Sequence, residues 1–384
     1  MSSARQIHLP TEIVFQVMIF VAADEFARQT TLHACCLVSR QWYSAAIALL
    51  YEKPHLNSGA SFRSFTATIS PPIGVRKSKW NLGAFLRKLD LSSLVHHSSP
   101  SLTARLLGRV KENLEVLIAP RVSFSSNSLP ALSKCLKLRH LDLSLVGDSM
   151  PFPLLKRAVS RLDNLTALRL PQSTSISDSE SFSIPWPPSL RRLQFSGRFS
   201  PLVMPTFPWP PSLTTLTLKN CADLSETTLS TLISSPDLAR TLKRLTVSGF
   251  NRHLSSESIN AILVFLPDLS FLSIPGDLVE STFLDLLYHV GSGALEVLEF
   301  GYPSFDAALY FTHAELLRLL RRHGAVPNLR AVGFSEVFCT EDRMVDDDEI
   351  DEILTRRAQS GPSVQTSPDA HRSVSDVDPG VYYV

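Results

Sequence analysis

Several features that mark common protein classes are missing from this 384-residue sequence. Its five cysteines show no C-x-x-C spacing, which argues against a zinc site and for a reducing compartment. No apolar run reaches the ~18 residues that a membrane-spanning helix requires. The apolar stretch 13–23 is interrupted by Gln16 and makes a poor secretion signal. We therefore expect a protein of the cytoplasm, the nucleus or both, without membrane contact.

Motifs of catalysis and nucleotide binding are missing as well. The chain has no Gly-rich phosphate loop, no G-x-S-x-G turn and no metal-ligand spacing, and its histidines are scattered. This predicts a chain that is not an enzyme and holds no cofactor and no metal. The 37 Lys and Arg residues nearly balance the 36 Asp and Glu residues, and no basic cluster is interleaved with aromatics. Nucleic acid is therefore a disfavoured partner.

The sequence does contain one phrase repeated ten times: Leu, two variable residues, an apolar residue, one variable residue and a further apolar residue. Nine intervals separate the first copy at Leu86 from the last at Leu329, 243 residues later, a mean period of 27 residues. This period and phrase are the signature of leucine-rich repeats. The last two apolar positions face the same side of a strand. Only stacked repeats can bury them in a continuous core. The copies begin at Leu86, Leu114, Leu138, Leu165, Leu190, Leu213, Leu242, Leu269, Leu295 and Leu329.

The segments between the predicted strands fall into two kinds. Most carry helical spacing in the C-terminal half, with Ser225, Ser255 and Thr312 at helix N-cap positions. The motif Pro-Trp-Pro-Pro-Ser-Leu at 185–190 and 208–213 excludes a helix interior, so we expect extended crossovers there. A proline-rich ligand for an SH3-type partner is the less favoured alternative.

These patterns predict an α/β fold, a leucine-rich-repeat solenoid over residues 52–340. Its parallel strands would line the concave side, and mostly helices would form the convex side. Residues 341–384 form a tail that holds eleven acidic residues against four arginines, a net charge of −7. The tail is rich in Ser, Pro and Asp after Gly361, so we expect it to be largely disordered, with one short helix over 346–357.

Residues 7–51 stand in front of the repeats and carry three short helical patterns. The first begins at Pro10, the second near Thr31 and the third after Ser39. About forty residues cannot bury a core of their own. Apolar residues left at the edge therefore predict a partner surface. The expected apolar faces are Ile13, Val17, Phe20 and Val21 in the first helix and Trp42, Ala46, Leu49 and Leu50 in the third.

Three blocks of this front segment resemble an F-box, particularly the fungal kind. They are Leu9-Pro10-x-Glu12-Ile13, then Cys36-Leu37-Val38-Ser39-Arg40-x-Trp42, and finally Leu50-Tyr51. An F-box followed by leucine-rich repeats is similar to the substrate receptors of cullin–RING (SCF) ubiquitin ligases. In that family the F-box docks on the S-phase kinase-associated adaptor, which bridges to the cullin, and the repeats hold the target protein.

The resemblance implies a non-catalytic receptor subunit that recognises a target for ubiquitylation. It also implies the adaptor contacts, which are Leu9, Pro10, Ile13, Leu37, Val38 and Trp42. Two alternatives remain. The chain could be an interaction scaffold that does not direct ubiquitylation, or residues 9–51 could simply cap the exposed edge of the first repeat.

A target surface is predicted from the variable positions of the repeat strands, which face the concave side. Arg169, Arg192, Lys219 and Arg244 fall on consecutive middle strands, with Gln194 among them. Arginine forks suit carboxylate and phosphate groups. We therefore expect this surface to hold an acidic or phosphorylated segment of an unknown target protein. The alternative is an ordinary solvated surface without a binding role.

Overall fold

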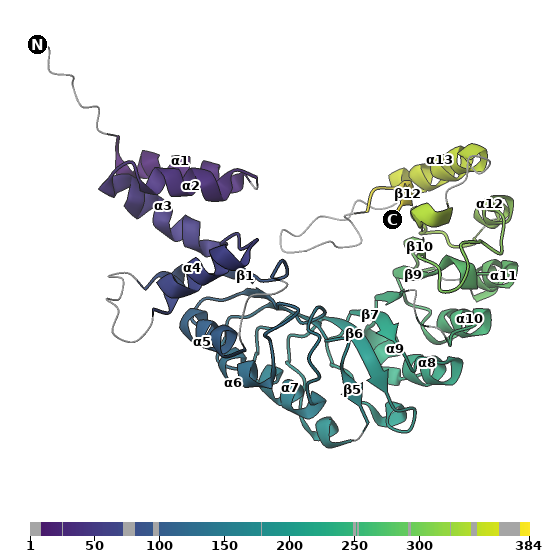
Figure 1. Cartoon of the computed structure of the whole chain (residues 1–384). Coiled ribbons are helices and arrows are strands. Elements are labelled where there is room, and N and C mark those ends of the chain that lie inside the picture. The colour runs from purple at the N-terminus through teal and green to yellow at the C-terminus, as the bar shows by residue number, and fades with distance from the viewer. Residues whose placement is uncertain are drawn as a thin grey trace, which may run out of the picture. The chain divides into compact units, whose positions relative to one another are not determined.

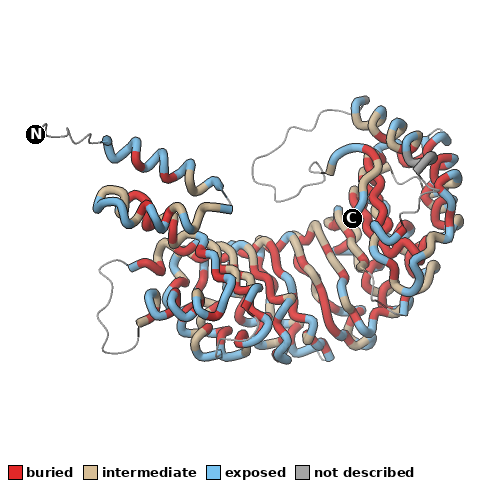
Figure 2. The backbone as a smooth tube through the Cα atoms, turned by 45° about the horizontal axis from the view of Figure 1, so that its top comes forward, coloured by how far each residue is buried: buried red, intermediate tan, exposed pale blue. Residues whose placement is uncertain are grey.

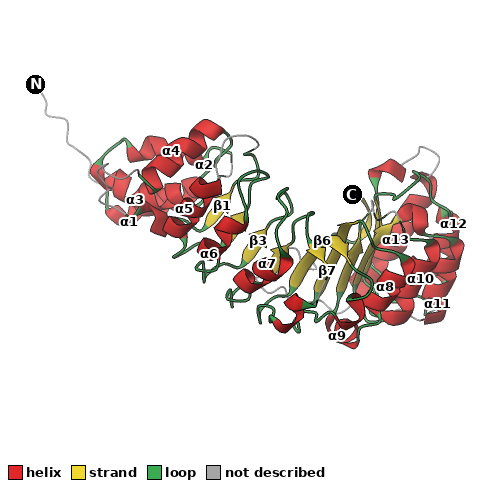
Figure 3. Cartoon of the chain, turned by 60° about the horizontal axis from the view of Figure 1, so that its bottom comes forward, coloured by secondary structure: helices red, strands yellow, loops and turns green. Residues whose placement is uncertain are grey.

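The computed structural model describes residues 9–24, 26–71, 81–94, 100–177, 179–248, 251, 253–290, 293–322, 324–338, 344–360 and 377–384. The chain divides into two compact units, residues 1–166 and 167–384. Each unit combines parallel strands with helices (Figure 1; Figure 3). No helix within the described ranges is long and apolar enough to cross a bilayer.

The first unit begins with the three helices expected in the front segment, followed by repeats with short strands. Its strands pair in parallel in the order β1-β2-β3, so that Lys88, Val116 and His140 lie in one row. The elements are α1 (Thr11–Ala23), α2 (Arg28–Cys36), α3 (Arg40–Glu52), α4 (Gly59–Ile69), η1 (Leu82–Phe85), β1 (Lys88–Asp90), α5 (Pro100–Val110), β2 (Val116–Ile118), η2 (Ser126–Ser128), α6 (Leu129–Leu132), β3 (His140–Asp142) and α7 (Phe152–Val159).

The front helices share a small core with the first repeat. Val14 and Met18 of α1, Leu32 of α2 and Ala46 of α3 are fully buried, and Leu82 of η1 joins their cluster. The leucines of the repeat phrase are buried in turn, as at Leu86, Leu89 and Leu91. Burying each such side chain contributes about 1.5–3 kcal/mol.

The second unit contains a long parallel sheet in the order β4-β6-β7-β8-β9-β10-β11-β12, and β5 pairs with part of β6. The repeat phrase sets its register, because the first apolar strand positions form one row that is at most 1% exposed: Leu168, Leu193, Leu216, Leu245, Leu272 and Leu298. The predicted stacking of parallel strands is confirmed within each unit. The strands are β4 (Ala167–Arg169), β5 (Ser175–Ile176), β6 (Arg192–Phe199), β7 (Thr215–Cys221), β8 (Arg244–Val247), β9 (Phe271–Pro275), β10 (Val297–Gly301), β11 (Ala331–Phe334) and β12 (Gly380–Tyr383).

Helices of the second unit lie on one face of this sheet (Figure 3). Ser225, Ser255 and Thr312 are N-caps as predicted, and each side-chain oxygen accepts the backbone N–H three residues on. The helices are α8 (Glu226–Ile233), α9 (Pro236–Thr241), α10 (Ser256–Phe265), α11 (Ser281–Val290), α12 (His313–Arg321) and α13 (Met344–Ser360), and the short turns are η3 (Glu180–Ser183), η4 (Met204–Thr206), η5 (Gly276–Leu278) and η6 (Glu336–Phe338).

Both proline motifs form extended crossovers, as expected. Trp186 and Trp209 point into the core and are 7% and 6% exposed. The Trp186 indole Nε1–H donates to the Pro208 carbonyl at 2.7 Å, and the ring of Phe207 lies 4.8 Å from that of Trp209. The motif therefore fills the space of a missing helix with aromatic rings. Because its tryptophans are buried, the motif is poorly placed to bind an SH3-type partner.

The expectation of a largely disordered tail is wrong for residues 344–360 and 377–384. Helix α13 is longer than predicted, and its Ile350 and Leu354 are fully buried. Arg357 donates to the carbonyls of Leu320 and Val326 at 2.6 and 2.8 Å. Strand β12 then extends the sheet beside β11. The physical reason is that the last repeat would otherwise expose its apolar edge. Residues 361–376 of the predicted tail lie outside the described residues.

Candidate protein-binding surfaces

Helix α1 exposes apolar side chains on both sides of its buried stripe. Val14 and Met18 face the bundle, whereas Ile13, Val17 and Phe20 are 49%, 41% and 83% exposed. Of the apolar face expected in this helix, Ile13, Val17 and Phe20 are therefore exposed, and only Val21 packs against the core of the helices. The helix is apolar almost all round, so periodicity alone does not select which face packs. The exposed stretches of the N-terminal helices are visible in Figure 2.

The first two of the three sequence blocks of the front segment lie side by side. The Gln41 side-chain amide on α3 donates to the Leu9 carbonyl at 2.7 Å and to the Thr11 hydroxyl at 3.3 Å. Leu37 and Val38 immediately precede α3 and are 75% and 62% exposed. This hydrogen bonding holds the start of α1 beside the junction between α2 and α3.

Five of the six predicted adaptor contacts are exposed at these positions: Leu9, Pro10, Ile13, Leu37 and Val38. Trp42 is half-buried and packs against the core of the helices, while its backbone N–H donates to the Ser39 hydroxyl that caps α3.

Sequence reasoning missed further exposed apolar residues, namely Phe15, Ile19 and Phe26. The signal that could have found Phe15 and Ile19 is the high apolar content of 13–23, which exceeds what a forty-residue bundle can cover. No comparable signal surrounds Phe26. Of the 23 large apolar residues exposed in the described parts of the chain, nine lie between Leu9 and Val38. We call these nine residues the N-terminal apolar surface: Leu9, Ile13, Phe15, Val17, Ile19, Phe20, Phe26, Leu37 and Val38. Contiguous exposed apolar surfaces are typical of interaction sites, whereas single exposed apolar residues are common on any protein.

A second candidate surface lies on the sheet of the second unit, on the face away from the helices. Register pairs Arg169 with Gln194, and it aligns Arg192 with Thr215 and then Arg244. Lys219 lies further along β7 and is exposed, as is Arg169, whereas Arg192, Gln194 and Arg244 are half-buried. The structure thus brings all five predicted target-binding residues to one face of four adjacent strands.

The charged side chains at the outward positions of these four strands are all basic. The pKa of the Arg192 guanidinium is lowered by burial and, second, by the nearby Arg169 charge. The Arg244 guanidinium lies 3.9 Å from the centre of the Phe271 ring, which holds it over the sheet. No acidic residue occupies the outward positions of β4, β6, β7 and β8. We call the group Arg169, Arg192, Gln194, Lys219 and Arg244 the basic strand surface.

The same face is already covered further along the sheet. Phe271, Val297 and Ala331 are buried there beneath Val377 and Tyr382. The Tyr382 hydroxyl donates to the Glu299 carboxylate at 2.6 Å. This C-terminal segment therefore covers the outward side of β9, β10 and β11 at these residues.

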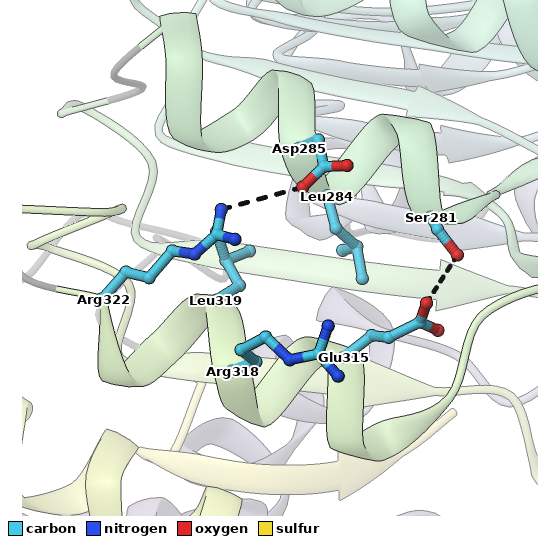
Figure 4. Close-up of a pocket in the computed structure, with 7 residues that line it drawn as sticks. All are labelled: Ser281, Leu284, Asp285, Glu315, Arg318, Leu319 and Arg322. Atoms are coloured by element: carbon cyan, nitrogen blue, oxygen red, sulfur yellow. Dashed lines mark hydrogen bonds and ion pairs between the residues drawn. The ribbon is translucent and has the colours of Figure 1, made fainter.

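A groove between α11 and α12 presents charged residues on the helical side (Figure 4). The Glu315 carboxylate accepts from the Ser281 hydroxyl at 2.8 Å and from the Thr312 backbone N–H at 2.8 Å, and these bonds, the Thr312 one first, lower its pKa. Arg322 lies 3.7 Å from the Asp285 carboxylate. These contacts cap α12 and join two neighbouring helices, so the groove has a structural explanation. No cluster of three potential metal ligands occurs within the described segments.

Comparisons with known proteins give two relatives. No family model matches the chain. It is 31% identical over 242 residues to "F-box protein YDR306C" of Saccharomyces cerevisiae. The aligned region covers 63% of this chain and 48% of the relative. It is 26% identical over 306 residues to "Protein pof5" of Schizosaccharomyces pombe. That aligned region covers 78% of this chain and 82% of the relative. The chain thus spans about half the length of the first relative and most of the second.

Solved structures show weaker likeness. A chain of the yeast Rad7–Elc1 complex has a TM-score of 0.37 at 14% identity and covers 75% of this chain and 87% of its own length. A chain of the TLR13–ssRNA13 complex has a TM-score of 0.32 at 15% identity, with 67% and 40% covered. By sequence, the chain is therefore similar to yeast proteins, one of which is named an F-box protein.

Proposed function

We propose that this chain is the substrate-recognition subunit of an SCF-type ubiquitin ligase of the cytoplasm, the nucleus or both. In this proposal, helices α1–α3 dock on the S-phase kinase-associated adaptor, which bridges to a cullin, and the sheet of the second unit holds the target. The N-terminal apolar surface carries the proposal, because Gln41 joins its two sequence blocks at one site. Similarity to a yeast protein named an F-box protein supports it.

The extent of the N-terminal apolar surface favours a protein interface over a cap for the first repeat. A cap for the first repeat would need only the buried side of α1, at Val14 and Met18. The flanking residues, such as Phe20 at 83% exposure, contribute nothing to that cap. Transferring each of them into an interface would contribute about 1.5–3 kcal/mol.

Binding of the purified chain to the adaptor, alone and with the cullin, tests this proposal. Replacing Ile13 or Leu37 by Ser should each weaken adaptor binding by about 2 kcal/mol, roughly 30-fold, by calorimetry. Leu202→Ser is the matched control, since Leu202 is 90% exposed in the second unit. Binding of adaptor and cullin indicates the ligase role, and adaptor binding alone indicates a scaffold. Failure to bind either one would leave α1–α3 as a cap.

For the target, we propose an acidic or phosphorylated segment on the basic strand surface. Its arginines and its lysine suit the negatively charged oxygens of carboxylates and phosphates. Candidate targets are the proteins that accumulate in cells when Ile13→Ser is combined with Leu37→Ser.

The charge reversals Arg169→Glu and Arg192→Glu should abolish capture of such a target while adaptor binding persists. Arg240→Glu on α9 is the control, because Arg240 is an exposed arginine on a helix, where it pairs with Asp237 three residues earlier. Equal capture by the double reversal and the control would refute the assignment of this surface.

A further inference from the structure

The loop between β10 and α12 exposes aromatic rings that neither proposed surface uses. Tyr302, Phe305 and Tyr310 are 53%, 62% and 56% exposed. Val337 of the adjacent η6 is 40% exposed. Aromatic side chains are enriched in the cores of protein interfaces, because they offer a large contact area at a low entropy cost. We call these four residues the aromatic rim.

The loop is held in place by a buried carboxylate. Asp277 is 5% exposed, and its oxygens accept the backbone N–H groups of Ser304, Phe305 and Asp306 at 2.8, 2.7 and 3.2 Å. These bonds anchor the part of the loop that presents Phe305. A preorganised surface loses less conformational entropy when a partner binds.

The loop and η6 also meet at one point. A side chain at Gly276 would bring its Cβ within 2.5 Å of the Phe338 ring and 3.0 Å of Leu309. Phe338 belongs to the same short turn as Val337, and Leu309 belongs to the loop. The close approach at Gly276 therefore places the loop and η6 at one edge of the sheet.

The charged residues of the loop, of η5 and of η6 are all acidic. Residues 275–280, 301–312 and 335–338 contain four acidic residues and no Lys, Arg or His. Asp277 is occupied by the loop, whereas Glu280, Asp306 and Glu336 are exposed. Asp306 lies beside the ring of Tyr310, with 3.5 Å between its carboxylate and the phenol oxygen. The sign is opposite to that of the basic strand surface.

We propose that the aromatic rim binds an arginine-containing basic segment of a protein partner. A guanidinium group can lie on an aromatic face and donate to a carboxylate at the same time. The second unit already uses the first contact internally, where Arg322 lies 4.9 Å from the Tyr288 ring centre. The exposed carboxylates would repel an acidic partner. This site goes beyond the adaptor and target surfaces, and neither of them depends on it.

The test uses the full chain and a fluorescein-labelled peptide of alternating Gly and Arg, with a Gly-Glu peptide for comparison. Fluorescence anisotropy at physiological salt measures the affinity. Phe305→Ser, and separately Asp306→Asn combined with Glu336→Gln, should each weaken binding of the arginine peptide about tenfold or more. Circular dichroism confirms that each variant is folded.

Two controls separate the aromatic rim from other binders of cations. Leu202→Ser removes an exposed apolar side chain elsewhere in the unit, and Asp348→Asn with Glu352→Gln removes exposed charges from the acidic helix α13. Both controls should bind the peptide as the unmodified chain does. The inference is overturned if the arginine peptide shows no binding, if the glutamate peptide binds equally well, if the rim variants have no effect, or if the α13 variant loses binding.

Discussion

Replacing Leu354 of α13 by alanine tests whether the acidic C-terminal region is an integral part of the second unit. Leu354 is fully buried, with Ile350 one turn earlier. Shortening a buried leucine removes its transfer free energy and leaves a cavity, at a cost of 2–5 kcal/mol. We expect a loss of about 3 kcal/mol. For a unit of this size each kcal/mol corresponds to about 2–4 °C, so its melting temperature should fall by about 6–12 °C.

Scanning calorimetry is the suitable assay, because the two compact units can unfold in separate transitions. Leu202→Ala makes the same chemical change at a 90% exposed position and should alter stability by less than about 0.5 kcal/mol. Ile353→Ala, at a half-buried position of the same helix, should fall between the two. If Leu354→Ala had no more effect than Leu202→Ala, the packing of α13 against the last repeat would be refuted.

Three further substitutions probe the fold. Burial lowers the pKa of the Lys156 ammonium from 10.5 to about 8, so between these values the unfolded chain binds more protons and stability rises with pH. Lys156→Met should remove that rise in denaturant titrations across this range, and an unchanged slope would exclude Lys156 as its source. Tyr382→Phe removes the bond to the Glu299 carboxylate and should cost about 1.5–3 kcal/mol by urea unfolding, whereas a neutral result would contradict the bond. Gly197 has φ +107°, and a Cβ there would lie 2.2 Å from the Thr174 carbonyl oxygen, so Gly197→Ala should cost at least about 2 kcal/mol by the same method. Wild-type stability of that variant would show that the strand accommodates a side chain.

The repeated parallel strands and their register could be predicted from the sequence. A strand side chain alternates between two faces, so the phrase beginning at Leu190 or Leu213 states which positions are buried without knowledge of distant contacts. The helix N-caps at Ser255 and Thr312 could also be predicted from local sequence. A cap depends on the backbone N–H only three residues further along the chain. The basic strand surface also followed from the register, since Arg169 and Gln194 occupy equivalent positions of adjacent strands.

Other features could not be predicted from the sequence, because they depend on which distant surfaces pack against each other. Helix α1 is apolar nearly all round, so only packing against α2 and α3 selected Val14 and Met18 over Ile13 and Val17. The composition of the C-terminal region favours disorder, but the open edge of the last repeat supplies an apolar surface on which α13 packs. Local sequence carries no information about that edge, because β11 and β12 are separated by more than forty residues along the chain. The burial of a side chain by a segment distant in the sequence depends on the whole fold, whereas the periodicity of a helix or strand depends only on residues close in the sequence.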